Sequence, residues 1–232
     1  MKKFIKLSVI SAMLCSSVAV AEDATQSVGL SAGTIGAELE YSRIIQPEYN
    51  LAVRVSIGGL SWDGDYDDTD THYDTNVDLF NVGATLEYHP MSNGFYLAAG
   101  AFYHNDDFSM EATPTGGKYE FNGTPYDASS AGTVTGEVYG LNHFAPYLGI
   151  GYDTSLFGSG NWFFTFKAGA WYQDSPRVNL TAHDCALDSV PGLPVGCDDL
   201  RYDLDQEEQD INDDIEDYKW WPVLHIGVSY RF

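Results

Sequence analysis

Hydrophobic and polar residues alternate with a period of two through most of this chain. The clearest block lies at the C-terminus, where one face carries Trp220, Pro222, Leu224, Ile226, Val228, Tyr230 and Phe232. The opposite face carries Trp221, Val223, His225, Gly227, Ser229 and Arg231. Because successive side chains of a β-strand point to opposite faces, the block predicts a strand with one continuous apolar side.

Six similar blocks precede it, at residues 35–42, 51–62, 80–89, 95–103, 144–152 and 162–172. Their lengths suit tilted membrane-spanning strands, which need about ten residues. Gly58 and Gly59 in the second block permit a bulge before Leu60 and Trp62. A barrel with both chain ends on one side needs an even number of strands. We therefore assign an eighth strand to residues 22–33, with a tight turn near Gly33 and Thr34.

The predicted strands are joined by two kinds of connection. Three are short turns, at residues 46–50, 91–94 and 155–160. Three are long and polar, at about residues 63–75, 107–139 and 174–219. Short periplasmic turns and long extracellular loops are typical of outer-membrane barrels. We predict an all-β fold, an eight-stranded antiparallel up-and-down transmembrane β-barrel; a soluble β-sandwich is the alternative.

The N-terminus predicts export. Lys2, Lys3 and Lys6 precede a short apolar stretch, and Ala19, Val20 and Ala21 fit the small-x-small rule for signal-peptide cleavage. Residues 1–21 are therefore predicted to be a signal peptide and residues 22–232 the barrel, placed in the outer membrane of a Gram-negative cell. The barrel would be assembled by the barrel-assembly machinery, for which the terminal aromatic strand with Tyr230 and Phe232 is the expected signal.

Charge limits the expected partners. The formal net charge is −23, and removal of three signal-peptide lysines changes it to −26. Nucleic acid is excluded as a partner, because phosphate binding needs basic patches. Small cationic solutes are attracted instead. We also expect contacts with outer-membrane lipid and lipopolysaccharide, a monomeric state and no cofactor.

The chain is not expected to be an enzyme. It contains no Gly-x-Ser-x-Gly and no His-Glu-x-x-His motif. A Ser-His-Asp arrangement stays open, since six histidines and many aspartates are present.

Charged residues also fall on the inward faces of the predicted strands. They are Glu38, Glu40, Arg54, Glu87, Lys167, His225 and Arg231. An eight-stranded barrel is only about wide enough inside for side chains, so these charges must be paired or hydrated. We expect Glu40 and Glu87 to share Arg54. The network is either a structural plug of ion pairs or a polar path for a cationic solute.

The long connections hold three further candidate features. An acidic mouth or cation site is predicted from Asp63, Asp65, Asp67, Asp68 and Asp70. The segment departs from the calcium-binding EF-hand pattern, which needs Gly at the sixth position and Glu at the twelfth. Cys185 and Cys197 are expected to form a disulfide in an exported protein, a metal pair being the alternative. Residues 203–217 predict a short acidic helix over the mouth, because their isoleucines and leucine have helical spacing; a disordered segment is the alternative, since so dense a charge disfavours compaction.

The order of several short motifs resembles the CarO family, the carbapenem-associated outer membrane proteins of Acinetobacter. The matching segments are residues 94–103, 145–151, 167–172, 176–180 and 218–222. The resemblance implies an eight-stranded monomeric barrel, uptake of small basic amino acids such as ornithine, and a link to carbapenem susceptibility. The alternative is a non-conducting barrel whose acidic extracellular loops serve adhesion, envelope stability or host interaction.

Overall fold

The structure is a computed structural model that describes residues 26–232, except 69–70, 115–116, 157–159 and 193. The predicted signal peptide, residues 1–21, lies outside the described residues, as do the first residues of the predicted first strand.

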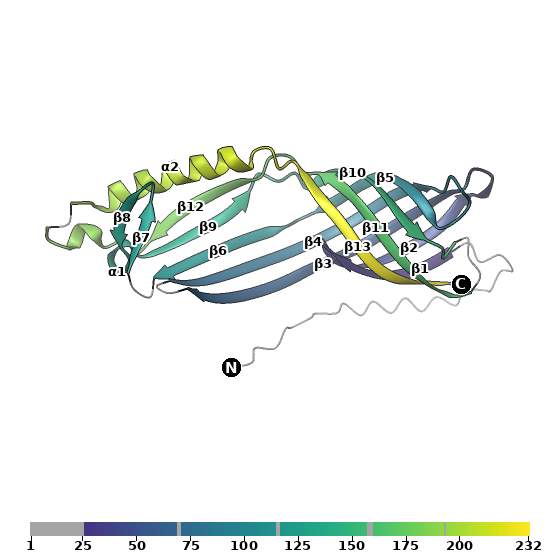
Figure 1. Cartoon of the computed structure of the whole chain (residues 1–232), viewed down its shortest axis with the longest axis horizontal. Coiled ribbons are helices and arrows are strands. Elements are labelled where there is room, and N and C mark those ends of the chain that lie inside the picture. Colours follow the sequence, from purple (N-terminus) through teal and green to yellow (C-terminus); the bar gives the residue numbers. More distant parts are fainter. Residues whose placement is uncertain (1–25, 69–70, 115–116, 157–159, 193) are drawn as a thin grey trace.

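Eight antiparallel strands close into a barrel (Figure 1). They are β1 (Gln26–Gly33), β2 (Gly36–Gln46), β3 (Leu51–Asp68), β4 (Thr71–Tyr88), β5 (Phe95–His104), β10 (Phe144–Asp153), β11 (Trp162–Tyr172) and β13 (Trp220–Arg231). Each strand pairs with its neighbours in this order, and β13 returns to β1 with Tyr230 opposite Val28. Closure leaves no free strand edge within the barrel, which a span through lipid requires. The predicted fold is confirmed, including the eighth strand and its tight turn after Gly33.

The two ends of the barrel differ. The turn end carries both described chain ends and the short connections, one of which includes the 3-10 helix η1 (Pro47–Tyr49). The loop end carries the tight β1–β2 turn and the three long connections. No helix among the residues that the structure describes is long and apolar enough to cross a membrane.

The outer surface of the barrel is apolar. Large side chains exposed there include Leu30, Leu39, Val55, Ile57, Val82, Leu86, Leu148, Ile150, Phe164, Leu224 and Ile226. Aromatic pairs lie toward both ends of this band. Trp162 packs edge-on against Tyr230 at the turn end, and Tyr172 against Trp220 at the loop end. Aromatic girdles on either side of an apolar band are typical of membrane barrels.

The long connections consist largely of regular structure. Beyond the barrel, β3 and β4 continue as a ribbon, and β6 (Asp107–Pro114), β9 (Thr133–Tyr139) and β12 (Arg177–His183) add to it in the order β3-β4-β6-β9-β12. We call this extension the outer sheet (Figure 1).

The bulge that Gly58 and Gly59 would permit is not formed. Pairing runs without a shift from Gly58 opposite Asn81 and Gly59 opposite Phe80 into the outer sheet, while a shift occurs between Ile44 and Gln46. Because the alternation of side chains continues unbroken past the two glycines, the face of β3 and β4 that is apolar on the outside of the barrel continues as an acidic face in the outer sheet. We call this the acidic face.

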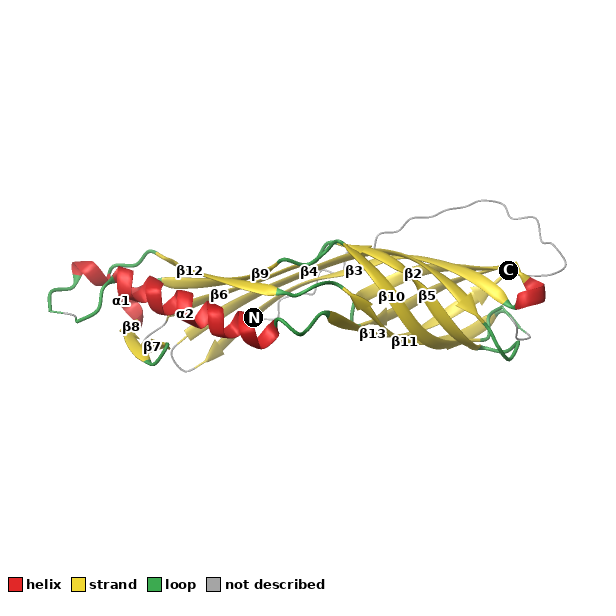
Figure 2. Cartoon of the chain, turned by 90° about the horizontal axis from the view of Figure 1, so that it is seen from above, coloured by secondary structure: helices red, strands yellow, loops and turns green. Residues whose placement is uncertain are grey.

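A small second core covers part of the inner face of the outer sheet. It is formed by the hairpin β7 (Lys118–Phe121) and β8 (Thr124–Asp127), with α1 (Ala128–Ala131), η2 (Leu187–Ser189) and α2 (Cys197–Ile215), as Figure 2 shows. The predicted acidic helix is thus present. It begins earlier than expected, at Cys197, and it lies along the outer sheet against β12, whereas the sequence predicted a helix over the barrel mouth. The Tyr126 hydroxyl donates to the Asp203 carboxylate at 2.6 Å, and this hydrogen bond lowers the pKa of Asp203.

Helix α2 also covers one edge of the outer sheet. The Asn212 side chain accepts from the Val178 amide at 2.7 Å and donates to its carbonyl at 3.0 Å. The Glu208 carboxylate accepts from the Leu180 amide at 3.0 Å. These bonds satisfy backbone groups of β12 that have no strand beside them among the described residues. An edge covered in this way is protected from pairing with another strand.

A disulfide joins Cys185 to Cys197, at the start of α2, as predicted. We expect the double variant Cys185→Ser/Cys197→Ser to lose about 2–3 kcal/mol of stability, because the bond closes a short loop in the unfolded chain. The loss should be confined to the second core. Limited proteolysis of α2 in detergent should speed up, while the heat-modifiable gel mobility of the barrel stays unchanged. Equal proteolysis rates would contradict the prediction.

Candidate functional site

The interior of the barrel holds two layers of side chains. The charge layer, toward the turn end, consists of Glu38, Glu40, Arg54, Glu87, Asp153, Lys167 and His225, all buried. The aromatic layer, toward the loop end, consists of Phe102, Tyr147 and Trp171 with Ile35 and Val223. Most of these side chains occupy inward-facing positions of the barrel strands. Every barrel strand except β1 contributes at least one of them.

Arg54 on β3 binds three carboxylates from three other strands. Its Nη1 lies 2.5 Å from Glu40 Oε2, and its Nε lies 2.6 Å from Glu87 Oε1. Its Nη2 lies 2.9 Å from Asp153 Oδ2. Tyr96 lies against the guanidinium, 5.6 Å from its ring centroid. The planar guanidinium thus uses its fork of donors to hold β2, β4 and β10 to β3.

Lys167 on β11 forms the second centre of the charge layer. Its ammonium lies 2.5 Å from Glu38 Oε2 and 2.9 Å from Glu40 Oε1. Ser31 donates to Glu40 Oε1 at 2.5 Å and lies 3.0 Å from His225 Nδ1. Glu40 therefore links the two centres, since one of its oxygens binds Arg54 and the other binds Lys167.

The layer carries excess negative charge. Among the described barrel residues, the buried charges are four carboxylates and two basic groups, which leaves two negative charges with the histidines neutral. Glu38, Glu40 and His225 bring ligand atoms within 4.8 Å of one another, as a metal site would. The Lys167 ammonium already binds both carboxylates, so a metal ion would have to displace it.

Six of the seven residues predicted for the interior network lie together. Arg231 does not: it ends β13 at the turn end, where its guanidinium donates to the Gly160 carbonyl at 3.0 Å and lies over the Phe163 ring. Arg231 does occupy one of the inward-facing positions of its strand, as predicted. It lies nearer the turn end of the barrel than the charge layer does. Glu40 faces Ser56 in the register and reaches Arg54 diagonally.

Asp153 was missed by the sequence analysis. It is buried and binds Arg54, and it also accepts from the Ser155 amide at 2.8 Å. The signal was present, because Asp153 continues the inward positions that include Gly149 and Gly151 on the same strand. The predicted block ended one residue too early.

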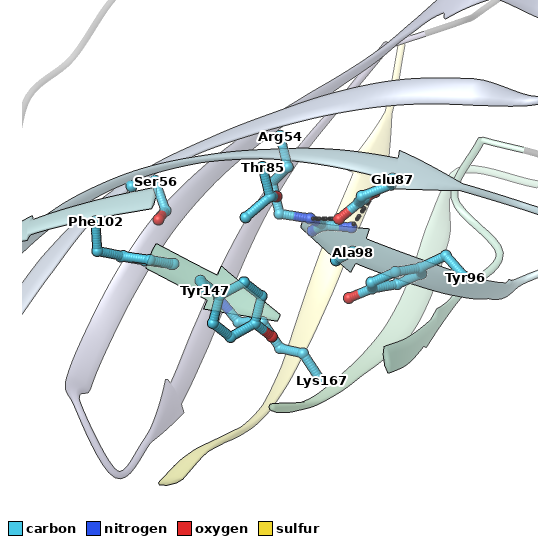
Figure 3. A pocket seen from close by; sticks show the side chains of 10 residues that line it. Arg54, Ser56, Thr85, Glu87, Tyr96, Ala98, Phe102, Tyr147 and Lys167 are labelled. Atoms are coloured by element: carbon cyan, nitrogen blue, oxygen red, sulfur yellow. Dashed lines mark hydrogen bonds and ion pairs between the residues drawn. The ribbon is translucent and has the colours of Figure 1, made fainter. Parts of the chain in front are cut away.

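The aromatic layer closes the barrel toward the loop end. The Trp171 indole is buried, stacks on His104 with centroids 4.8 Å apart, and contacts Phe102 at 5.3 Å. Phe102 also meets the Tyr147 ring edge-on at 5.3 Å. The cavity between the two layers (Figure 3) is about 10 Å³, which is room for roughly one water molecule.

A larger hollow lies on the acidic face of the outer sheet. Its volume is about 440 Å³, and its charged lining is Asp63, Asp65, Asp74, Glu111 and Glu137. We call it the acidic hollow. Two residues of the predicted acidic mouth, Asp63 and Asp65, therefore line it. Asp67 and Asp68 belong to β3 but their side chains lie outside the described part of the chain, as does all of Asp70.

Comparison with known proteins gives a consistent result at the level of the fold. No protein-family model and no curated protein sequence matches the chain. Among solved structures, CarO of Acinetobacter baumannii is 25% identical, with a TM-score of 0.60 over 90% of this chain and 97% of that one. CarO2 of the same species is 25% identical, with a TM-score of 0.62 over 89% of this chain and 98% of that one.

Proposed function

We propose that this CarO-like outer-membrane β-barrel admits small cationic solutes, such as ornithine and other basic amino acids, through an interior that ion pairs close at rest. One observation carries the proposal. Four buried carboxylates hold a guanidinium and a primary ammonium group, those of Arg54 and Lys167. A basic amino acid offers the same cationic groups and can exchange with them.

The charge distribution supports this direction of selectivity. With the turn end in the periplasm, the acidic hollow lies outside the cell, where its carboxylates attract cations. The charge layer, in which four carboxylates outnumber two basic groups, then adds negative charge inside. An anionic solute meets repulsion at both places. The proposal involves no catalytic step.

Liposome swelling tests the proposal with three solutes of similar size. We expect ornithine to enter fastest, glutamine more slowly and glutamate slowest. A difference of about 1.4 kcal/mol in the barrier corresponds to a tenfold ratio of rates, and we expect at least that between ornithine and glutamate. A carbapenem, which carries a carboxylate, should enter more slowly than ornithine. Equal rates for the three amino acids, or no swelling above protein-free liposomes, would contradict the proposal.

A second candidate function is a non-conducting barrel that works at the cell surface in adhesion, envelope stability or host interaction. The narrow cavity of about 10 Å³ favours it, as does the outer sheet that stands beyond the barrel (Figure 2). Absence of swelling, with the barrel folded as judged by heat-modifiable mobility, would select this candidate.

A further inference from the structure

One edge of the outer sheet has no strand beside it among the residues that the structure describes. The strand β2 pairs with β3 only as far as Gly59, opposite Ala37, whereas β4 pairs with β3 as far as Asp68. Residues 60–64 of β3 therefore have a side paired with β4 and, among the residues that the structure describes, a second side with no strand beside it. In Figure 1 this strand forms the lower border of the outer sheet, opposite the border that α2 covers.

The backbone of this segment directs hydrogen-bonding groups to the open side. The His89 amide donates to the Asn50 carbonyl at 3.0 Å, which makes even-numbered residues of β3 the hydrogen-bonded partners of β4. In an antiparallel pair the alternate residues point their backbone groups the other way. Ser61 and Asp63 thus present N–H and C=O groups toward the open edge, at the spacing that a further strand requires.

The side chains of the open edge differ between its two faces. Ser61, Asp63 and Asp65 lie on the acidic face, where the last two line the acidic hollow. Trp62 and Tyr66 lie on the other face and are 48% and 66% exposed. The edge is therefore acidic on one face and aromatic on the other.

A second copy of the chain is a poor occupant for this edge. Antiparallel pairing of two such segments would place aspartates near aspartates across the strands, and like charges at these positions destabilise a sheet. A strand with basic residues on one face and apolar residues on the other would complement both faces. The opposite edge of the outer sheet differs, because Asn212 and Glu208 of α2 bind the backbone of β12 there.

We propose that the open edge of β3 binds an extended basic peptide segment by strand addition, with Lys or Arg alternating with apolar residues. Backbone hydrogen bonds to Ser61 and Asp63 extend the outer sheet by one strand. The carboxylates of Asp63 and Asp65 select the basic side chains, and Trp62 and Tyr66 contact the apolar ones. This binding stands apart from solute uptake, because it uses the outer sheet and not the barrel interior.

The test uses the full chain in detergent micelles and a synthetic nine-residue peptide in which lysine alternates with valine and tyrosine. Calorimetry gives its Kd. Three control peptides are measured beside it: the same residues in scrambled order, glutamate in place of lysine, and backbone N-methylation at alternate residues. N-methylation keeps the charge but removes donors along one peptide edge. We expect the alternating peptide to bind at least tenfold more tightly than each control.

Protein variants separate strand addition from charge attraction. Asp63→Asn/Asp65→Asn should weaken binding at least tenfold, whereas Asp205→Asn/Asp210→Asn, an equal charge change on exposed positions of α2, should leave the Kd unchanged. Ser61→Pro removes an open-edge amide without breaking the ladder to β4, and it should weaken binding with no change in charge.

Several results would overturn the proposal. They are equal binding of the N-methylated or scrambled peptide, unchanged binding by Ser61→Pro in a folded barrel, and peptide-free association of the chain through this edge. Should Ser61→Pro fail to fold, the N-methylated peptide still decides, because it is tested on the unaltered protein. Failure of peptide binding leaves the swelling assay unaffected, so the two proposals are judged separately.

Discussion

Replacing Arg54 with alanine is expected to lower the free energy of unfolding of the barrel by about 3–5 kcal/mol. The substitution leaves Glu40, Glu87 and Asp153 facing one another in the interior without the group that binds all three. Each carboxylate has less than a twentieth of its side chain exposed, so solvent cannot screen them. Removal of one partner of a buried pair leaves uncompensated charge. Here Glu87 and Asp153 both lose the guanidinium, while Glu40 keeps its contact with Lys167.

Urea unfolding in proteoliposomes, followed by tryptophan fluorescence and by heat-modifiable mobility, measures the loss. Arg43→Ala is the matched control, because Arg43 is exposed on β2, and its change should stay within about 0.5 kcal/mol. Arg54→Lys should fall between the two, since an ammonium keeps the charge but not the planar fork. In barrels that remain folded, we expect cation leakage to rise. Unchanged stability would contradict the assignment of Arg54 as the centre of a dry ion-pair layer.

The barrel strands could be predicted from the sequence because lipid imposes a strict rule on them. Each outward position must be apolar, and the inward positions then stand out by contrast, as Glu38 and Glu40 do between Ala37, Leu39 and Tyr41. The same alternation identified the first strand, in which exposed Val28 and Leu30 alternate with buried small residues that include two serines.

The position of a residue along the barrel axis could not be obtained in the same way. The alternation of positions along a strand shows whether a side chain points into the barrel. It does not show how far along the barrel axis that side chain lies, because neighbouring strands are tilted and offset. Arg231 has the parity of His225 and Ser229, yet it lies at the turn end, beyond the charge layer. Asp153 lies within that layer although it is the last residue of its strand.

The outer sheet was predicted as loops for a related reason. Residues 63–68 are mostly aspartate and glycine, which are depleted in strands and common in turns. Their strand conformation comes from continued pairing with β4, so that Asp63 lies opposite Asn76 and Asp65 opposite Asp74. Composition contains no record of such pairing, because the ladder to β4 joins backbone groups, whichever side chains these residues carry.

Replacing Trp171 with alanine is the second change with a large expected effect. The indole is 1% exposed and packs against Phe102 and His104, so its loss should cost about 3–5 kcal/mol through lost contacts and the cavity left behind. It should also open the aromatic layer toward the loop end. Swelling with small solutes should then speed up, and cations should gain most, because the charge layer below stays intact.

Trp162→Ala is the matched control for this prediction. It removes the same side chain from the same strand, but Trp162 is 73% exposed on the outer surface at the turn end. Its loss leaves the interior filled, so we expect swelling at the rate of the unaltered protein. The double variant Trp171→Ala/Arg54→Ala tests whether the two layers act as barriers in series. If they do, its swelling rate should exceed the sum of the swelling rates of the two single variants. If Trp171→Ala swells no faster than Trp162→Ala while remaining folded, the aromatic layer is not what closes the barrel.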